Sequence, residues 1–372
     1  MPDSPQINLL KLPMLFPSLL GLLGLLVLFA EFSSTLSHPH WKAHLVAHHH
    51  AKSLRKVQHR QHPKASGFRR AQNTYHSSKR QSSSGRFLDL PSGSIKIDDI
   101  YLGFLPDDGT TGGQRQSMEE IIHALHGKQI GIYGFYAQVN NDELFEGYQF
   151  KWIMDDLKKS KAVFNPAVMP PKDWSGLTYQ DNRQAVAIAK VCAKIHQEGI
   201  PVWLRAFHEA NWYQRTHEYS GGPKEFKEAW DVLAKAVRQF APGVWMHWSP
   251  NIAHNNNTSE YHEYQPYRFE ETVDLVGIDY YPSSKPPPNH FIDSFKYFHD
   301  TFASERRKMV IGETGLHYPG SLQDKIDWLQ QIANGKKELP YLVGVVWYNQ
   351  KKGWDYKITG KGISNLLEAK LG

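Results

Sequence analysis

The stretch Pro201-Val-Trp-Leu-Arg-Ala-Phe-His-Glu-Ala-Asn-Trp212 has the pattern of a short apolar strand that ends in charged and polar residues. Because the side chains of a strand alternate between its two faces, we expect Arg205, Phe207 and Glu209 on one face. An arginine and a carboxylate on the same face of an otherwise apolar strand indicate a functional site at its carboxyl end. A structural ion pair between Arg205 and a neighbouring acid is the alternative.

Seven further short apolar runs accompany this strand along the chain. They are residues 100–104, 130–135, 162–167, 244–248, 275–278, 309–311 and 342–347. The residues between them carry helical apolar spacing, as in the segment 226–240. Eight short strands that alternate with helices predict an α/β fold, a (β/α)8 TIM barrel, as one catalytic domain over residues 96–372. An open doubly wound sheet is the alternative, although no Gly-x-Gly-x-x-Gly motif and no phosphate loop follow the first strand.

A second carboxylate, Glu313, ends the seventh predicted strand within Gly312-Glu-Thr-Gly315. Active sites of such barrels lie at the carboxyl ends of the strands, so Glu209 and Glu313 should face each other across one mouth. Glycoside hydrolysis needs this arrangement, with one carboxylic acid protonated and the other ionised. Glu313 could instead be a structural acid that accepts hydrogen bonds from the amides of its glycine-rich turn.

Aromatic side chains stand at or just past several strand ends, where they can offer apolar platforms to the C–H faces of sugars. These are Trp212, Trp248, Tyr281 and Trp347. The dipeptide His208-Glu209 does not continue to His-Glu-x-x-His, which excludes the zinc-protease pattern. The single cysteine, Cys192, excludes a disulfide scaffold within the chain and any cysteine-based zinc or iron–sulfur site. We therefore expect no metal and no cofactor.

The amino-terminal residues resemble a targeting segment. Residues 12–30 carry no charge and are rich in leucine, which indicates a signal peptide over residues 1–37, cleaved after Ser37. A signal anchor is the alternative, because 19 apolar residues just suffice to span a bilayer.

A basic segment follows the predicted signal peptide. Residues 38–80 hold nine His, ten Lys or Arg and no acid, which is the composition of a His-rich, disordered pro-segment. Removal at Lys79-Arg80 would leave residues 81–95 as a linker, and N-terminal sequencing of the secreted protein should then begin near Gln81. Metal capture by His48-His49-His50 is the alternative function of this segment.

The basic charge of the chain belongs to these first residues. Residues 1–80 hold 11 Lys or Arg against two acids, and the whole chain carries +6, so residues 81–372 carry −3. Nucleic-acid binding by the barrel therefore has no electrostatic support. We expect a secreted, extracellular monomer with a polysaccharide as its partner and no stable membrane association after processing. Asn256 and Asn257 begin two overlapping glycosylation sequons, of which one is expected to carry a glycan.

Five motifs stand at successive predicted strand ends. They are Arg205-x-x-His208-Glu209-x-Asn211, Trp248-Ser-Pro-Asn251, Val276-Gly-Ile-Asp279-Tyr-Tyr281, Gly312-Glu313-Thr-Gly315 and Val346-Trp347-Tyr-Asn349. Together they resemble glycoside hydrolase family 26, a clan A (β/α)8 family of mostly endo-β-1,4-mannanases. The resemblance implies that Glu209 is the acid/base and Glu313 the nucleophile of a retaining reaction. It also implies that His208, Tyr281 and Trp347 line the subsite of attack. With Arg205, Asn211, Trp212 and Trp248 they form the expected substrate-binding set.

Two departures from the family pattern fall on substrate contacts. Family members often carry a Trp-His pair after the second strand, where this chain has Tyr133-Gly-Phe-Tyr136. The tryptophan that usually follows the acid/base has only Trp212 as its nearest candidate. A β-glucanase or a β-1,3-xylanase on the same barrel therefore stays open. The alternative of another class is a non-catalytic carbohydrate-binding barrel, which would be expected to lose one of the two carboxylates.

Overall fold

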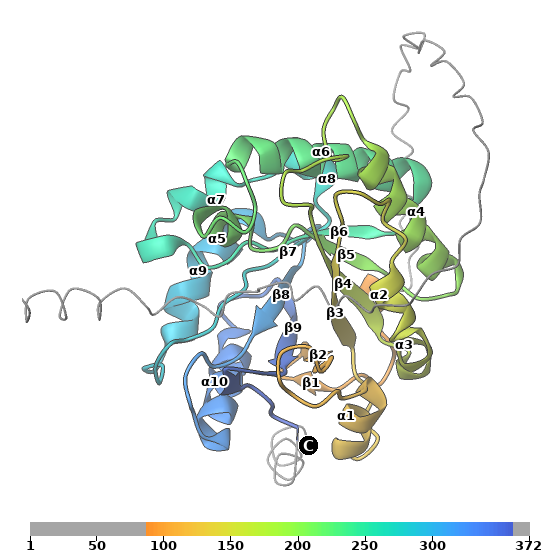
Figure 1. Ribbon diagram of the computed structural model, residues 1–372. Helices are drawn as coiled ribbons and strands as arrows, with labels where there is room; N and C mark the ends of the chain where they lie inside the picture. Colours follow the sequence, from red (N-terminus) through yellow and green to blue (C-terminus); the bar gives the residue numbers. More distant parts are fainter. Residues whose placement is uncertain (1–86, 360–372) are drawn as a thin grey trace, which may run out of the picture. The chain divides into compact units, whose positions relative to one another are not determined.

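The computed structural model of the protein describes residues 87–359 (Figure 1). The predicted signal peptide (1–37) and pro-segment (38–80) lie outside the described residues, as do residues 81–86 and 360–372. Within residues 87–359, no helix is both long enough and apolar enough to cross a membrane.

Eight parallel strands form a closed barrel. They are β2 (Ile100–Pro106), β3 (Ile132–Gln138), β4 (Val163–Met169), β5 (Trp203–Ala206), β6 (Trp245–Trp248), β7 (Leu275–Val276), β8 (Met309–Thr314) and β9 (Leu342–Asn349). Each strand pairs with the next, and β9 also pairs with β2, with Val346 opposite Gly103. This last pairing closes the sheet, so the predicted (β/α)8 barrel is confirmed and the open sheet is excluded. All eight predicted apolar runs fall on these strands.

Helices surround the ring of strands (Figure 1). They are α1 (Met118–Ala124), α2 (Tyr148–Lys151), α3 (Met154–Ser160), α4 (Arg183–Gln197), α5 (Ala210–Arg215), α6 (Pro223–Phe240), α7 (Ser259–Glu263), α8 (Phe269–Thr272), α9 (His290–Phe302) and α10 (Leu322–Gly335). The short elements are η1 (Phe87–Asp89), β1 (Lys96–Ile97), η2 (His254–Asn256), β10 (Lys351–Lys352) and β11 (Trp354–Asp355). Helix α6 begins at a proline and buries Phe226, Trp230, Leu233 and Val237, which recur at helical spacing.

The strands separate two apolar layers. Side chains that point into the barrel include Leu105, Ile132, Val163, Trp203, Leu275, Val310 and Val346. The other face of the strands packs against the surrounding helices, and both layers are buried. Strand alternation therefore decides whether a residue faces the barrel axis or the helices.

The folded domain begins earlier than the predicted boundary at residue 96. Leu88 is 4% exposed and packs with the residues inside the barrel. The amide of Ile95 donates to the carbonyl of Gln129 (2.7 Å), just before β3. The linker prediction for residues 81–95 is therefore wrong for the part that the structure describes, because its apolar residues belong to the core.

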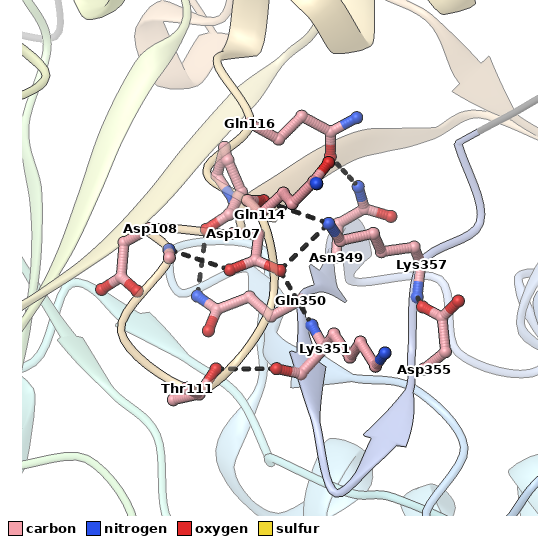
Figure 2. A network of polar contacts seen from close by, with 12 residues as sticks. Asp107, Asp108, Thr111, Gln114, Gln116, Asn349, Gln350, Lys351, Asp355 and Lys357 are labelled. Carbon is pink, nitrogen blue, oxygen red and sulfur yellow. Dashed lines mark hydrogen bonds and ion pairs between the residues drawn. The ribbon is translucent and has the colours of Figure 1, made fainter.

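A buried carboxylate ties the first barrel strand to the last (Figure 2). Asp107, just after β2, accepts hydrogen bonds from the amides of Gly109 (2.9 Å) and Lys351 (3.0 Å). It also pairs with the Lys357 ammonium at 3.0 Å. Gln350 donates to the carbonyl of Pro106 (3.0 Å). These contacts hold the β10–β11 hairpin at the carboxyl end of the barrel.

Candidate active site

Glu209 lies in the sharp turn between β5 and α5. The strand ends at Ala206, and Phe207 and Glu209 both adopt left-handed backbone conformations, with φ of 52° and 50°. Strict alternation therefore stops at the end of the strand. Phe207 packs edge-on against Trp174 in the outer layer (5.3 Å between ring centroids), which corrects its expected position on the face of Glu209.

The carboxyl group of Glu209 is buried and receives one hydrogen bond. The Asn251 amide nitrogen donates to its Oε1 at 2.8 Å. Burial, together with the nearby charge of Glu313, raises the pKa of Glu209 to about 7. A large fraction of Glu209 is therefore protonated at neutral pH, as a proton donor requires.

Asn211 positions Asn251. Its side-chain amide donates to the carbonyl of Asn251 (3.0 Å) and accepts from the amide of Asn251 (2.9 Å). Asn211 is itself buried. Because both of its polar atoms bond to the backbone of Asn251, Asn211 supports the residue that bonds Glu209.

Glu313 is the last residue but one of β8 and is surrounded by hydrogen-bond donors. Its Oε2 accepts from the hydroxyls of Tyr136 (2.5 Å) and Tyr281 (2.8 Å), and its Oε1 accepts from the Arg205 guanidinium. Burial acts to raise the pKa of Glu313. The charge of Arg205 and the hydrogen bonds from Tyr136 and Arg205 outweigh this effect, so the pKa is lowered. Glu313 is therefore ionised at neutral pH, the opposite state to Glu209.

Arg205 is buried between two carboxylates. It donates to Asp279 (2.5 Å) as well as to Glu313, and Ser249 donates to the other oxygen of Asp279 (2.6 Å). A β-carbon at Gly312 would lie 2.6 Å from Asp279 and 2.8 Å from Arg205, which explains the glycine before Glu313. In this arrangement Arg205 is the group that holds Glu313 charged.

His208 stands beside Glu313 without a charge. Its ring lies 5.5 Å from the rings of Tyr136 and Tyr213, and its Nε2 is 3.8 Å from the Oε1 of Glu313. Burial and the charge of Arg205 lower its pKa to about 3. The imidazole is therefore neutral at neutral pH.

Two of the four predicted aromatic platforms face away from the carboxylates. Trp248 packs on the helices, with Phe269, Phe298 and Phe302 at 5.1–5.6 Å. Trp347 is fully buried in the same outer layer. Both predictions are corrected for the same reason. Adjacent residues of a strand point to opposite faces, so an error of one residue in the assumed alternation turns a side chain from the barrel interior to the helices.

The inward residue of β9 at this level is Tyr348, whose ring meets those of Tyr281 (5.9 Å) and Tyr356 (5.0 Å). Tyr281 lies at the site, as its hydrogen bond to Glu313 shows. Trp212 is half-buried on α5, with the Arg215 guanidinium 4.9 Å from its ring.

Four residues that contact the two carboxyl groups or their partners were not among the site residues predicted from the sequence. They are Tyr136, Asn251, Asp279 and Tyr348. Asn251 and Asp279 stood inside motifs that carry the family resemblance. Tyr136 stood where the family pattern departs. All four lie in the last residues of a barrel strand or just after one, and that position was the signal available for finding them.

In the part of the chain that the structure describes, no group of three or more His, Cys, Asp or Glu side chains is placed to hold a metal ion. The alternative of metal capture by His48-His49-His50 concerns residues outside those that the structure describes.

The fold and the site define a (β/α)8 barrel with two buried carboxyl groups of opposite protonation, at the ends of β5 and β8. No protein-family model and no curated protein matches the sequence. Solved structures do match, and several of them are mannanases. The Bacillus subtilis mannanase man26 is 15% identical over 74% of this chain and 86% of its own, with a TM-score of 0.51.

Two more similar structures have the same fold. A modular endo-β-1,4-mannanase from Cellulomonas fimi is 15% identical, covering 74% of this chain and 76% of its own, with a TM-score of 0.52. A family 26 β-mannanase from Bacteroides ovatus is 16% identical, covering 74% and 88%, with a TM-score of 0.52. The chain therefore has the barrel fold of the family 26 mannanases.

Proposed function

We propose that the protein is a retaining glycoside hydrolase that cleaves a β-linked polysaccharide, and that it is an endo-β-1,4-mannanase. The observation that carries the proposal is the contrast between the two carboxyl groups. Glu209 has a pKa raised to about 7, whereas Arg205 and two hydroxyl groups hold Glu313 ionised. One group can donate a proton while the other attacks.

The reaction follows from these states. Glu313 attacks the anomeric carbon while Glu209 gives its proton to the leaving oxygen, which forms a glycosyl-enzyme. Glu209, now ionised, takes a proton from water as the water attacks the same carbon and releases Glu313. Tyr281 and Tyr136 keep the attacking oxygen oriented in the resting site.

Mannan is proposed from the five motifs and from the names of the similar structures, which are mannanases. The predicted sugar contacts do not single out mannan. Trp248 and Trp347 do not reach the site, and Tyr136 stands where family 26 members often carry a Trp-His pair. A β-glucan or a β-1,3-xylan is therefore the second candidate. The non-catalytic barrel is disfavoured by the opposite protonation of Glu209 and Glu313, which binding alone does not require.

Release of reducing sugar from mannan, mixed-linkage glucan and β-1,3-xylan tests the proposal. We expect release from mannan by the wild type and none by Glu313→Gln, which keeps the shape of the site. Proton NMR of the first-formed product should show the β-anomer, as retention requires. Release of reducing sugar from only one of the other polymers would identify that polymer as the substrate instead of mannan. Retardation of the protein by a polymer held in the gel during affinity electrophoresis, with no release of reducing sugar from any polymer, would favour the non-catalytic barrel.

We further propose secretion as a monomer, with removal of residues 1–80 and no stable membrane association. Residues 81–372 then act without the basic segment. Asn256 and Asn257 are exposed in the loop after β6, which suits a glycan on one of them. The mass of the secreted protein before and after deglycosylation tests the removal of residues 1–80 and the presence of the glycan.

The activity should depend on pH through the two carboxyl groups. Activity requires protonated Glu209, so kcat/KM should fall as the pH rises through about 7. It also requires ionised Glu313, so kcat/KM should fall at low pH, below the usual carboxyl range. Asn251→Ala removes a bond that lowers the pKa of Glu209, and its alkaline limb should therefore lie at higher pH. A profile that is flat from pH 6 to pH 9 would contradict the assigned proton donor.

A further inference from the structure

The β10–β11 hairpin presents two side chains on one face. Lys352 and Trp354 are direct partners in the antiparallel pair, with Gly353 between them at a φ of 68°. Directly opposite residues of an antiparallel pair share a face of the ladder. Lys352 and Trp354 are therefore presented together.

The face that carries Lys352 is near the carboxylates. The charge of Lys352 acts to lower the pKa of Glu209, and the charges of Glu313, Glu209 and Glu218 act on Lys352 in turn. Burial outweighs these charges and lowers the pKa of Lys352 to about 8. Charge–charge interactions weaken with distance and with screening by water, so Lys352 lies on the side of the hairpin toward the two carboxyl groups. The hairpin thus borders the site.

The residue that follows the hairpin connects it to the site directly. Tyr356 is buried, and its ring lies 5.8 Å from that of Tyr281 and 5.0 Å from that of Tyr348. Tyr281 donates to Glu313. One layer of aromatic rings therefore runs from the attacking carboxylate to the base of the hairpin.

The hairpin is held in place from both sides. The amide of Lys351 donates to Asp107, and Thr111 donates to the carbonyl of Lys351 at 2.8 Å (Figure 2). On the other strand, the Lys325 ammonium donates to the carbonyl of Asp355 at 2.6 Å. A platform fixed before binding loses little conformational freedom when a ligand arrives.

Trp354 remains 40% exposed on this fixed hairpin. We propose that the β10–β11 hairpin forms a sugar-binding subsite next to the sugar that Glu313 attacks, with Trp354 stacking on the C–H face of a pyranose and Lys352 donating to its hydroxyl groups. The ligand class is a neutral β-linked chain, because an anionic sugar would meet Glu209, Glu313 and Glu218 as well as Lys352. This subsite rests on the proposed function.

Chain-length dependence tests the subsite. The substrates are β-linked oligosaccharides of increasing length, built from the sugar that the wild type hydrolyses, and an activated aryl glycoside of a single sugar. Trp354→Ala should raise KM for the longer oligosaccharides about tenfold and should leave the aryl glycoside unchanged. Trp354→Tyr should restore most of the loss, because it keeps an aromatic face.

Phe240→Ala is the matched control. Phe240 is 36% exposed at the carboxyl end of α6, which leads into β6 at the opposite end of the barrel. The Phe240→Ala variant should have the KM of the wild type for every substrate. The subsite would be overturned if Trp354→Ala had wild-type KM values for oligosaccharides of every length. An equal rise in KM for the aryl glycoside would overturn it as well. A wild type that hydrolyses no substrate would refute the proposed function instead, and the subsite with it.

Discussion

Glu313→Ala is expected to abolish turnover on every substrate, with a fall in kcat of roughly 10⁴- to 10⁶-fold, the scale seen when other enzymes lose a covalent nucleophile. Without this carboxylate no glycosyl-enzyme can form, so a better leaving group cannot rescue the reaction. The measurement is kcat on the polysaccharide and on an activated aryl glycoside. Both should fall to a similar extent.

Two variants distinguish the loss of the nucleophile from a folding defect. Glu313 is one of two acidic partners of the buried Arg205, so its removal also leaves a buried guanidinium N–H group without its hydrogen-bond partner. Glu313→Gln keeps the volume and should be equally inactive while it retains more of the thermal stability. Glu305→Ala removes an acid that is 84% exposed just before the same strand, and it should be as active as the wild type. Substantial turnover by Glu313→Gln would remove Glu313 from the role of nucleophile.

Glu209→Ala should instead lose activity according to the leaving group. On the polysaccharide we expect a fall of roughly 10²- to 10⁴-fold, because the leaving oxygen is no longer protonated. An aryl glycoside with a good leaving group needs little protonation, so its first step should survive. The glycosyl-enzyme should then accumulate, because water also loses its general base. A burst of aryl alcohol and the mass of the trapped intermediate are the measurements.

Azide separates the two roles. It attacks without losing a proton, so it should restore the second step of Glu209→Ala and yield a glycosyl azide of retained configuration. It should do far less for Glu313→Ala, which forms no intermediate. The alkaline limb near pH 7 should also disappear in Glu209→Ala. Equal losses on both substrates, with rescue of neither variant, would mean that the two roles are assigned wrongly.

The strands of the barrel could be predicted from the sequence because each is a local apolar run. Residues 202–207 and 309–311 marked β5 and β8, and polar residues marked the ends of these strands. The ends of parallel strands meet at one mouth, so Glu209 and Glu313 could be paired from their positions alone. The domain start was missed because the few apolar residues around Leu88 have no strand or helix periodicity.

The faces of residues beyond a strand end could not be predicted. Alternation holds only while the backbone is extended, and the left-handed conformations of Phe207 and Glu209 break it. Trp347 and Tyr348 are both aromatic neighbours, so composition cannot say which one points inward. The register of β9 against β2 and β8 decides it, and Tyr348 is the inward residue.

The sequence by itself determined the barrel and the two carboxylates at its mouth, because both depend on local periodicity and on the direction of parallel strands. Only the tertiary structure decided why Glu209 carries the proton and Glu313 does not. Tyr136 and Arg205 reach Glu313 from 177 and 108 residues away, while Asn251 and burial act on Glu209. A pKa depends on the charges and donors within a few ångströms, and these come from different strands that only folding brings together.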